Sequence, residues 1–183
     1  MGIARNIARL IPNGSGVLSD ANAPSGSVIQ VVQVIKTDTQ TFSAGSMDQT
    51  THYEVTGLTL NITPISTSSK ILLIAQVSVG QTGDSYNISL SLVRNGTTRI
   101  GNGTSGFASY GTGVSSRSFS GNHITAVPLL FQDSPNTTSQ LSYGVWVNNN
   151  GGSTSPSYIN RNASANGFFG NVSSVLTAME ISG

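Results

Sequence analysis

The chain has 183 residues, a net charge of +1 and no cysteine, so it is long enough for one domain with a buried core but forms no disulfide. Charged residues make up 8% of the sequence, against about 25% in ordinary soluble domains, and Gly, Ser, Thr and Asn take their place. The charges are scattered singly and leave no basic stripe for nucleic acid, and no apolar run is long enough for membrane insertion.

Residues 1–11 are expected to form a short amphipathic helix that ends at Pro12. An isolated helix of this length has marginal stability in water, because nucleation is unfavourable and a short helix adds few hydrogen bonds after it. We therefore expect its apolar side to bind another protein or the same helix in sister chains. At helical spacing, four apolar residues form one stripe, namely Ile3, Ile7, Leu10 and Ile11. Two basic residues lie beside this stripe, Arg5 and Arg9.

Residues 12–27 are rich in Gly, Ser, Asn and Pro, a composition typical of a linker. The chain is therefore expected to have three parts. These are a helical anchor over residues 1–11, a linker over 12–27 and a globular knob over 28–183.

The knob begins with segments that are typical of strands. Residues 27–42 are dense in β-branched side chains, and in residues 54–64 Leu58, Leu60 and Ile62 alternate with polar residues. Residues 69–79 are apolar on both faces in their first half, which predicts a central strand.

Four further segments predict strands in the second half of the knob. Ile88, Leu90 and Leu92 share one face before Asn95-Gly96, a strong hairpin signal. Residues 123–131 are mostly apolar. Alternation recurs in the last two segments, with Leu141, Tyr143, Val145 and Val147 in the first and Val175, Thr177, Met179 and Ile181 in the second.

These segments predict an all-β fold, an antiparallel β-sandwich of jelly-roll type with about eight strands. Two polar segments, residues 101–122 and 148–171, are longer than ordinary turns. Segments of this length either carry function or contain edge strands.

Catalytic chemistry requires titratable groups that converge, and the sequence contains only His52, His123 and seven scattered carboxylates. Both histidines fall at predicted loop-to-strand boundaries, and neither has the spacing of a metal ligand. We expect no enzymatic activity, no cofactor and no metal site.

Aromatic and arginine side chains among small polar residues make the two long segments candidates for glycan binding. Rings can stack on the apolar faces of sugars while amides and guanidinium groups bind the hydroxyls. The alternative is that these rings fill the ends of the sandwich or a subunit interface. The candidate contacts are Phe107, Tyr110 and Arg117 in the first segment and Tyr158 and Arg161 in the second.

Residues 1–34 and 55–79 carry a resemblance, over nearly the whole chain, to tail-fibre and related virion proteins of tailed bacteriophages, especially those of aquatic bacteria and cyanobacteria. In that family an N-terminal helical arm, ending here in Arg-Leu-Ile-Pro-Asn-Gly-Ser-Gly, attaches the fibre to the virion. The C-terminal sandwich commonly forms a homotrimeric knob. The present chain passes from arm to knob without the long repetitive shaft of many fibres.

The resemblance implies a virion structural protein that is made in the host cytoplasm, in agreement with the absence of a signal-peptide pattern at residues 1–11. We expect a short homotrimeric tail fibre, anchored to the tail or baseplate by its helix and facing a host-surface glycan. Trimerisation would also compensate for the lack of disulfides. A capsid decoration or head-fibre protein that stabilises the shell is the alternative.

Overall fold

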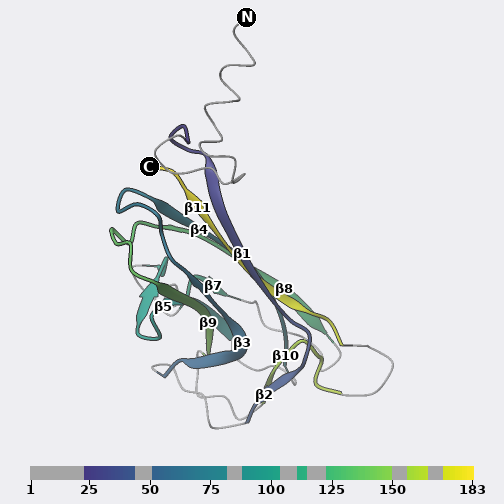
Figure 1. Cartoon of the computed structure of the whole chain (residues 1–183). Coiled ribbons are helices and arrows are strands. Elements are labelled where there is room, and N and C mark those ends of the chain that lie inside the picture. The colour runs from purple at the N-terminus through teal and green to yellow at the C-terminus, as the bar shows by residue number, and fades with distance from the viewer. Residues whose placement is uncertain are drawn as a thin grey trace, which may run out of the picture.

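The computed structural model describes residues 23–43, 51–81, 88–103, 111–114, 123–149, 156–164 and 171–183. Within these ranges the chain is all-β and has eleven strands in two antiparallel sheets (Figure 1). The predicted anchor and most of the predicted linker lie outside the described residues. The strands are β1 (Val28–Lys36), β2 (Gln40–Phe42), β3 (Tyr53–Ile62), β4 (Lys70–Gln81), β5 (Ile88–Arg94), β6 (Thr98–Ile100), β7 (Gly113–Val114), β8 (Ile124–Asp133), β9 (Leu141–Asn149), β10 (Ser157–Ile159) and β11 (Ser174–Ile181).

The strand pairing is nested, which confirms the predicted jelly roll. β1 pairs with β11, β3 with β9, β4 with β8, and β5 with β6, so the chain is one long hairpin folded over itself. This wrapping generates the two Greek-key sheets of a jelly roll. These four pairs contain eight strands, the number that was expected, and β2, β7 and β10 are three additional short strands.

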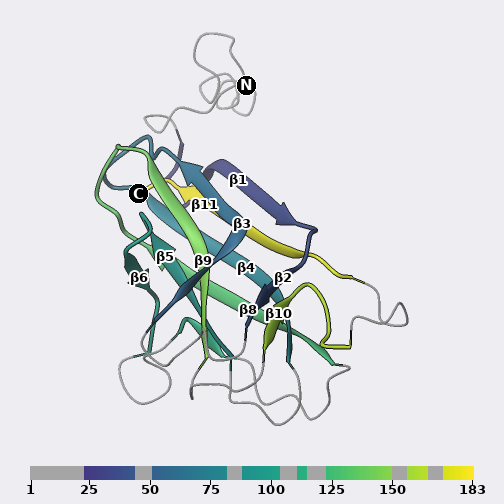
Figure 2. The same cartoon turned by 90° about the horizontal axis from the view of Figure 1, so that it is seen from below.

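The two sheets form separate layers packed face to face (Figures 1 and 2). In the six-stranded sheet, β4 is central as predicted: β8 follows one of its edges, while β11 and then β10 follow the other. β1 lies outside β11, and β2 lies outside β10. The five-stranded sheet has the order β3-β9-β5-β6, with β7 also beside β5.

One hydrophobic core fills the space between the sheets. The predicted alternation in β9 is confirmed, because Leu141, Tyr143, Val145 and Val147 are all buried in this strand. On the opposing sheet the core contains every second residue of β4, namely Ile71, Leu73, Ala75, Val77 and Val79.

In strand β11 the alternating residues named in the sequence lie on the side away from the core. Leu176 and Ala178 are fully buried and belong to the core, whereas Val175 and Met179 lie on the outer side of the six-stranded sheet with Thr177 and Ile181. Both sides of this strand carry apolar residues, so the alternation predicts a strand without specifying its inner face.

Asn95 and Gly96 form the predicted hairpin turn between β5 and β6. Their φ angles are 53° and 66°, and the Thr97 N–H donates to the Arg94 carbonyl oxygen at 3.3 Å. Two successive positive φ values are what a type I′ turn requires, and Asn followed by Gly tolerates them best.

The strands give the knob two distinct ends. Gly26 and Ser182 are joined by a backbone hydrogen bond of 2.8 Å, so β1 starts where β11 finishes. We call this the near end; it lies at the top of Figure 1. The β2–β3, β4–β5, β7–β8 and β9–β10 connections join strand ends at the opposite, far end, where β2 and β10 lie.

Candidate interaction surfaces

Tyr158 and Arg161, two predicted glycan contacts, lie together at the far end. The Arg161 guanidinium carbon is 4.1 Å from the centre of the Tyr158 ring, and its Nη2 donates to Thr41 Oγ1 at 3.0 Å. Such stacking of a cation on an aromatic ring is favourable. It also leaves Tyr158 only 7% exposed, so the surface group here is the guanidinium more than the ring. Phe107, Tyr110 and Arg117 lie outside the described residues.

Asn160 fixes the segment that carries this pair. It is fully buried and has a φ of 63°, and its side-chain amide donates to the carbonyl oxygens of Lys36 and Asp38, each at 2.9 Å. Its Oδ1 accepts a 2.6 Å bond from Ser174 Oγ. Asn160 therefore joins β1, β10 and β11. The only sequence signal for it is the tolerance of Asn for positive φ, which is too common to identify one residue.

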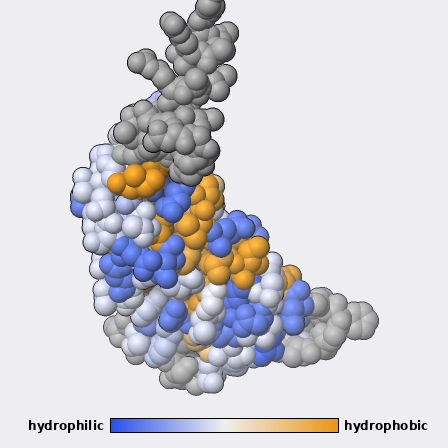
Figure 3. Space-filling view, in the orientation of Figure 1, coloured by the Kyte–Doolittle hydropathy of each residue, from blue (hydrophilic) through white to orange (hydrophobic). Residues whose placement is uncertain are grey.

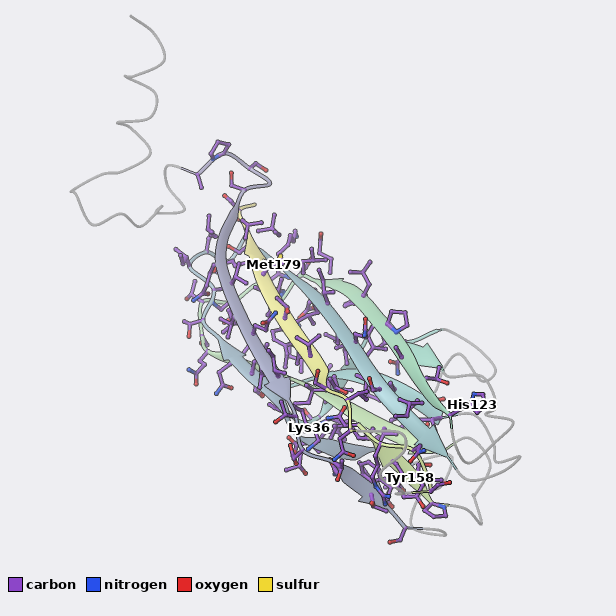
Figure 4. All side chains as sticks on the ribbon, turned by 90° about the vertical axis from the view of Figure 1, so that its right-hand side faces the viewer. Lys36, His123, Tyr158 and Met179 are labelled. Atoms are coloured by element: carbon purple, nitrogen blue, oxygen red, sulfur yellow. The ribbon has the colours of Figure 1, made fainter. Side chains whose placement is uncertain are left out.

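The same segment covers the far end of the outer side of the six-stranded sheet. A Cβ atom built on Gly80 of β4 would clash with the Arg161 carbonyl oxygen and would lie 3.1 Å from Asn162 Cα. Glycine is needed here because another backbone approaches closely. Tyr158 pairs with Gly80 and stands on this outer side (Figure 4), and Arg161 stacks on its ring.

Gln40 connects the two sheets near these residues, and further polar pairs lie on the five-stranded sheet. Gln40 of β2 donates to the Glu54 carbonyl oxygen at 3.1 Å and accepts from the Thr56 N–H at 2.9 Å. Nearby on β3, the Glu54 carboxylate accepts a 2.8 Å bond from Thr59. His52 accepts at Nε2 from Arg99 at 3.0 Å, because a guanidinium can only donate. Amides, hydroxyls and arginines are groups that suit recognition of sugar hydroxyls.

Arg94, Asp133 and Tyr143 form a second polar group, between the sheets towards the near end. The Arg94 Nη1 donates to both Asp133 oxygens, at 3.0 and 2.8 Å, and the Tyr143 hydroxyl donates to Oδ2 at 2.7 Å. Burial, followed by the hydrogen bond to the Asp133 carboxylate, raises the pKa of Tyr143 far above its ordinary value. The phenol therefore stays protonated and holds the sheets together.

The outer side of the six-stranded sheet carries exposed apolar residues. Figure 3 shows a hydrophobic band along β1, and Figure 4 shows Met179 on the neighbouring β11. Exposure is 67% for Leu130 and 56% for both Val31 and Ile35. We define the apolar face by the residues that strand register places together here: Val31 and Ile35 of β1, Val175 and Met179 of β11, Leu72 and Ile74 of β4, and Pro128 and Leu130 of β8.

Neither a metal cluster nor a membrane-spanning helix is found among the described residues. In those ranges no three His, Asp or Glu side chains are grouped as metal ligands. No helix there has the length and hydropathy needed to cross a bilayer.

No protein-family model matches the chain, and no curated protein has significant sequence similarity to it. Its function has to be inferred from its own residues and their arrangement.

Proposed function

We propose that the chain is a virion structural protein of a tailed bacteriophage. In this proposal it is a short homotrimeric tail fibre: the helix of residues 1–11 binds the tail or baseplate, and the far end of the jelly roll contacts a host-surface glycan. The role is attachment and display rather than catalysis.

The observation that carries the proposal is the separation of the two ends of the knob. The hydrogen bonds of Gly26 and Ser27 with Ser182 hold the start of the knob at the near end. The predicted anchor and linker precede these residues in the chain, so the anchor is attached at that end. The strand ends that four of the connections join lie at the far end. A protein fixed at one end and exposed at the other is suited to display.

The polar groups of the far end support a glycan as the contacted molecule. Arg161 presents its guanidinium beside Thr41, on the outer side of the six-stranded sheet. Glycans are recognised through such hydrogen-bonding groups and through ring faces. The host receptor is therefore proposed to be a surface saccharide that contacts Arg161.

A phage whose gene for this chain is altered tests the anchor. Deletion of residues 1–11 is expected to give a folded knob that is absent from purified particles. A finer comparison is Ile7→Asp against Ala8→Asp, because helical spacing places residue 7 in the apolar stripe and residue 8 well outside it. Incorporation should be lost only in the first. Particles that still contain the truncated chain would contradict the proposed anchor.

Particles that lack the chain separate the tail fibre from the alternative, a capsid decoration or head-fibre protein. Loss of adsorption to host cells with a shell of normal heat stability supports the fibre. Normal adsorption with a shell that ruptures at lower temperature supports decoration. In the first case, Arg161→Ala in the full chain should reduce adsorption without reducing incorporation.

A further inference from the structure

We infer that the apolar face is the surface through which copies of this chain pack on one another. The inference rests on the homo-oligomer in the proposed function and adds the interface. The occupant proposed is a second copy of the knob, seated on the outer side of β1, β11, β4 and β8.

The apolar residues of the face are neighbours in register. Val31, Met179 and Leu72 form one row across β1, β11 and β4. Ile74 and Leu130 are paired in the next row, and Ile35 and Val175 in the third. An exposed contiguous patch of this kind on a soluble domain usually marks an interaction site.

The face is almost without charge. Among the described strand residues whose register points them to this side, Lys70 alone is charged, and it lies at the edge nearest the near end. Arg161, which follows β10, lies on the same side at the far end. Between these two cations, a strongly basic or acidic partner would find no complementary charge. A second copy brings an equally neutral surface, so two copies meet without desolvating unpaired ions.

Two of the four polar residues within the face bond to each other; the other two are Gln76 and Gln132. Gln33 Nε2 of β1 donates to Thr177 Oγ1 of β11 at 3.0 Å. Covering the face therefore leaves this hydroxyl and amide with a partner. Burial of polar groups is costly chiefly when it leaves them unsatisfied, so the pair reduces the cost of covering this region.

The size of the face fits a second copy better than a short helix. Four strands about 4.8 Å apart and seven residues at about 3.4 Å each give roughly 450 Å² in projection, over half of the ~800 Å² that each partner of a stable complex buries. An eleven-residue helix, about 16 Å long and about 10 Å wide, covers roughly 160 Å². The predicted anchor helix of the same chain would leave most of the face exposed.

The edges of the sheet favour contact through the face over contact by strand addition. β1 and β8 are its two long outer strands, and β1 has a bulge between Val28 and Gln30. β8 contains Pro128, which has no N–H to offer to an added strand. Bulges and prolines are common protections of sheet edges. Leu130, two residues later, projects from the face instead.

The first test is the mass of the full chain in solution at about 10 μM, by light scattering and native mass spectrometry. The wild-type protein is expected to be a homo-oligomer. Leu130→Glu and Ile35→Glu, on opposite strands of the face, should each weaken association by roughly 100-fold because a carboxylate becomes buried in an apolar contact. Asn61→Glu, an exposed position on β3 of the other sheet, is the matched control.

A crosslink gives a second readout that does not depend on weakening the oligomer. The chain has no cysteine, so Ile74→Cys introduces a single thiol at the centre of the face. In the proposed trimer the three faces would meet at the symmetry axis, so mild oxidation should join two of the three chains and give about two thirds of this variant as covalent dimer. The same treatment of Asn61→Cys should leave monomers on a denaturing gel. Circular dichroism melting curves confirm that each variant is folded.

An oligomer that keeps its wild-type mass in both glutamate variants and gives no Ile74→Cys crosslink would overturn the inference while leaving a homo-oligomeric fibre intact. A monomeric wild-type chain would contradict both the interface and the proposed trimer. If only the anchor experiment fails, the proposed fibre is contradicted and the proposed interface is not.

Discussion

The hydroxyl of Tyr143 in β9 donates a 2.7 Å hydrogen bond to the carboxylate of Asp133 in β8, and so joins the two sheets of the jelly roll. Tyr143 has no exposed surface, and Asp133 is also bound by Arg94 of β5. A charged group is therefore held between the layers with its oxygens paired.

Loss of this pairing should lower the free energy of unfolding. Tyr143→Phe is expected to cost about 1 kcal/mol, because Asp133 keeps Arg94 as a partner. Asp133→Ala should cost about 3 kcal/mol, because a partly buried guanidinium and a phenol both lose their acceptor. Urea unfolding measures both values. Tyr53→Phe removes a hydroxyl from a ring that packs against Phe42, and a similar cost there would show that the Asp133 bond has no special effect.

Alkaline pH should destabilise the wild-type protein through the same residue. The pKa of Tyr143 is raised in the folded state, so above about pH 10 the unfolded chain releases a proton that the folded chain retains. The free energy of unfolding contributed by this group then falls by about 1.4 kcal/mol per pH unit. The contribution of Tyr143 is the difference between the wild-type and Tyr143→Phe proteins in free energy of unfolding, measured as a function of pH. Parallel profiles from pH 9 to 11 would refute the expectation.

Asp38→Asn should destabilise the knob at neutral pH. The Lys36 ammonium is buried, and its 2.7 Å bond to the exposed Asp38 lowers the pKa of that carboxyl. A group with a lowered folded pKa stabilises the protein above its unfolded pKa, about 3.9, and loses that effect as the pH falls through the folded value. The melting temperatures of the variant and the wild type should differ at pH 7 and converge as the pH falls below the lowered pKa of Asp38. A constant difference would show that the charge of Asp38 is not responsible.

Asn160→Asp should destabilise the chain by roughly 3 kcal/mol, because it replaces a buried donor to two carbonyl oxygens with a carboxylate. Thermal unfolding at pH 7 measures the change. Asn136→Asp is a matched control, since Asn136 also has a positive φ, 52°, but is exposed. Equal losses at both positions would point to the backbone conformation rather than to the bonds with Lys36 and Asp38.

Local pattern alone was sufficient to predict the fold class and most strands. In β9, each of Leu141, Tyr143, Val145 and Val147 faces the core as the alternation predicts, and Asn95-Gly96 forms the hairpin turn that this dipeptide predicts. Such features depend on backbone preference and on the two-residue period of a strand, which neighbouring residues carry.

Contacts between distant segments were decided only by the tertiary structure. The inner side of β11 depends on its pairing with β1 and β4, because both sides of the strand are apolar. Asn160 gains its role from carbonyl oxygens more than a hundred residues away in the chain. The apolar face, likewise, exists only once β1, β11, β4 and β8 lie side by side. The sequence by itself therefore determined an all-β knob, whereas the tertiary structure decided which of its surfaces are left for a partner, since burial depends on contacts that the local pattern does not contain.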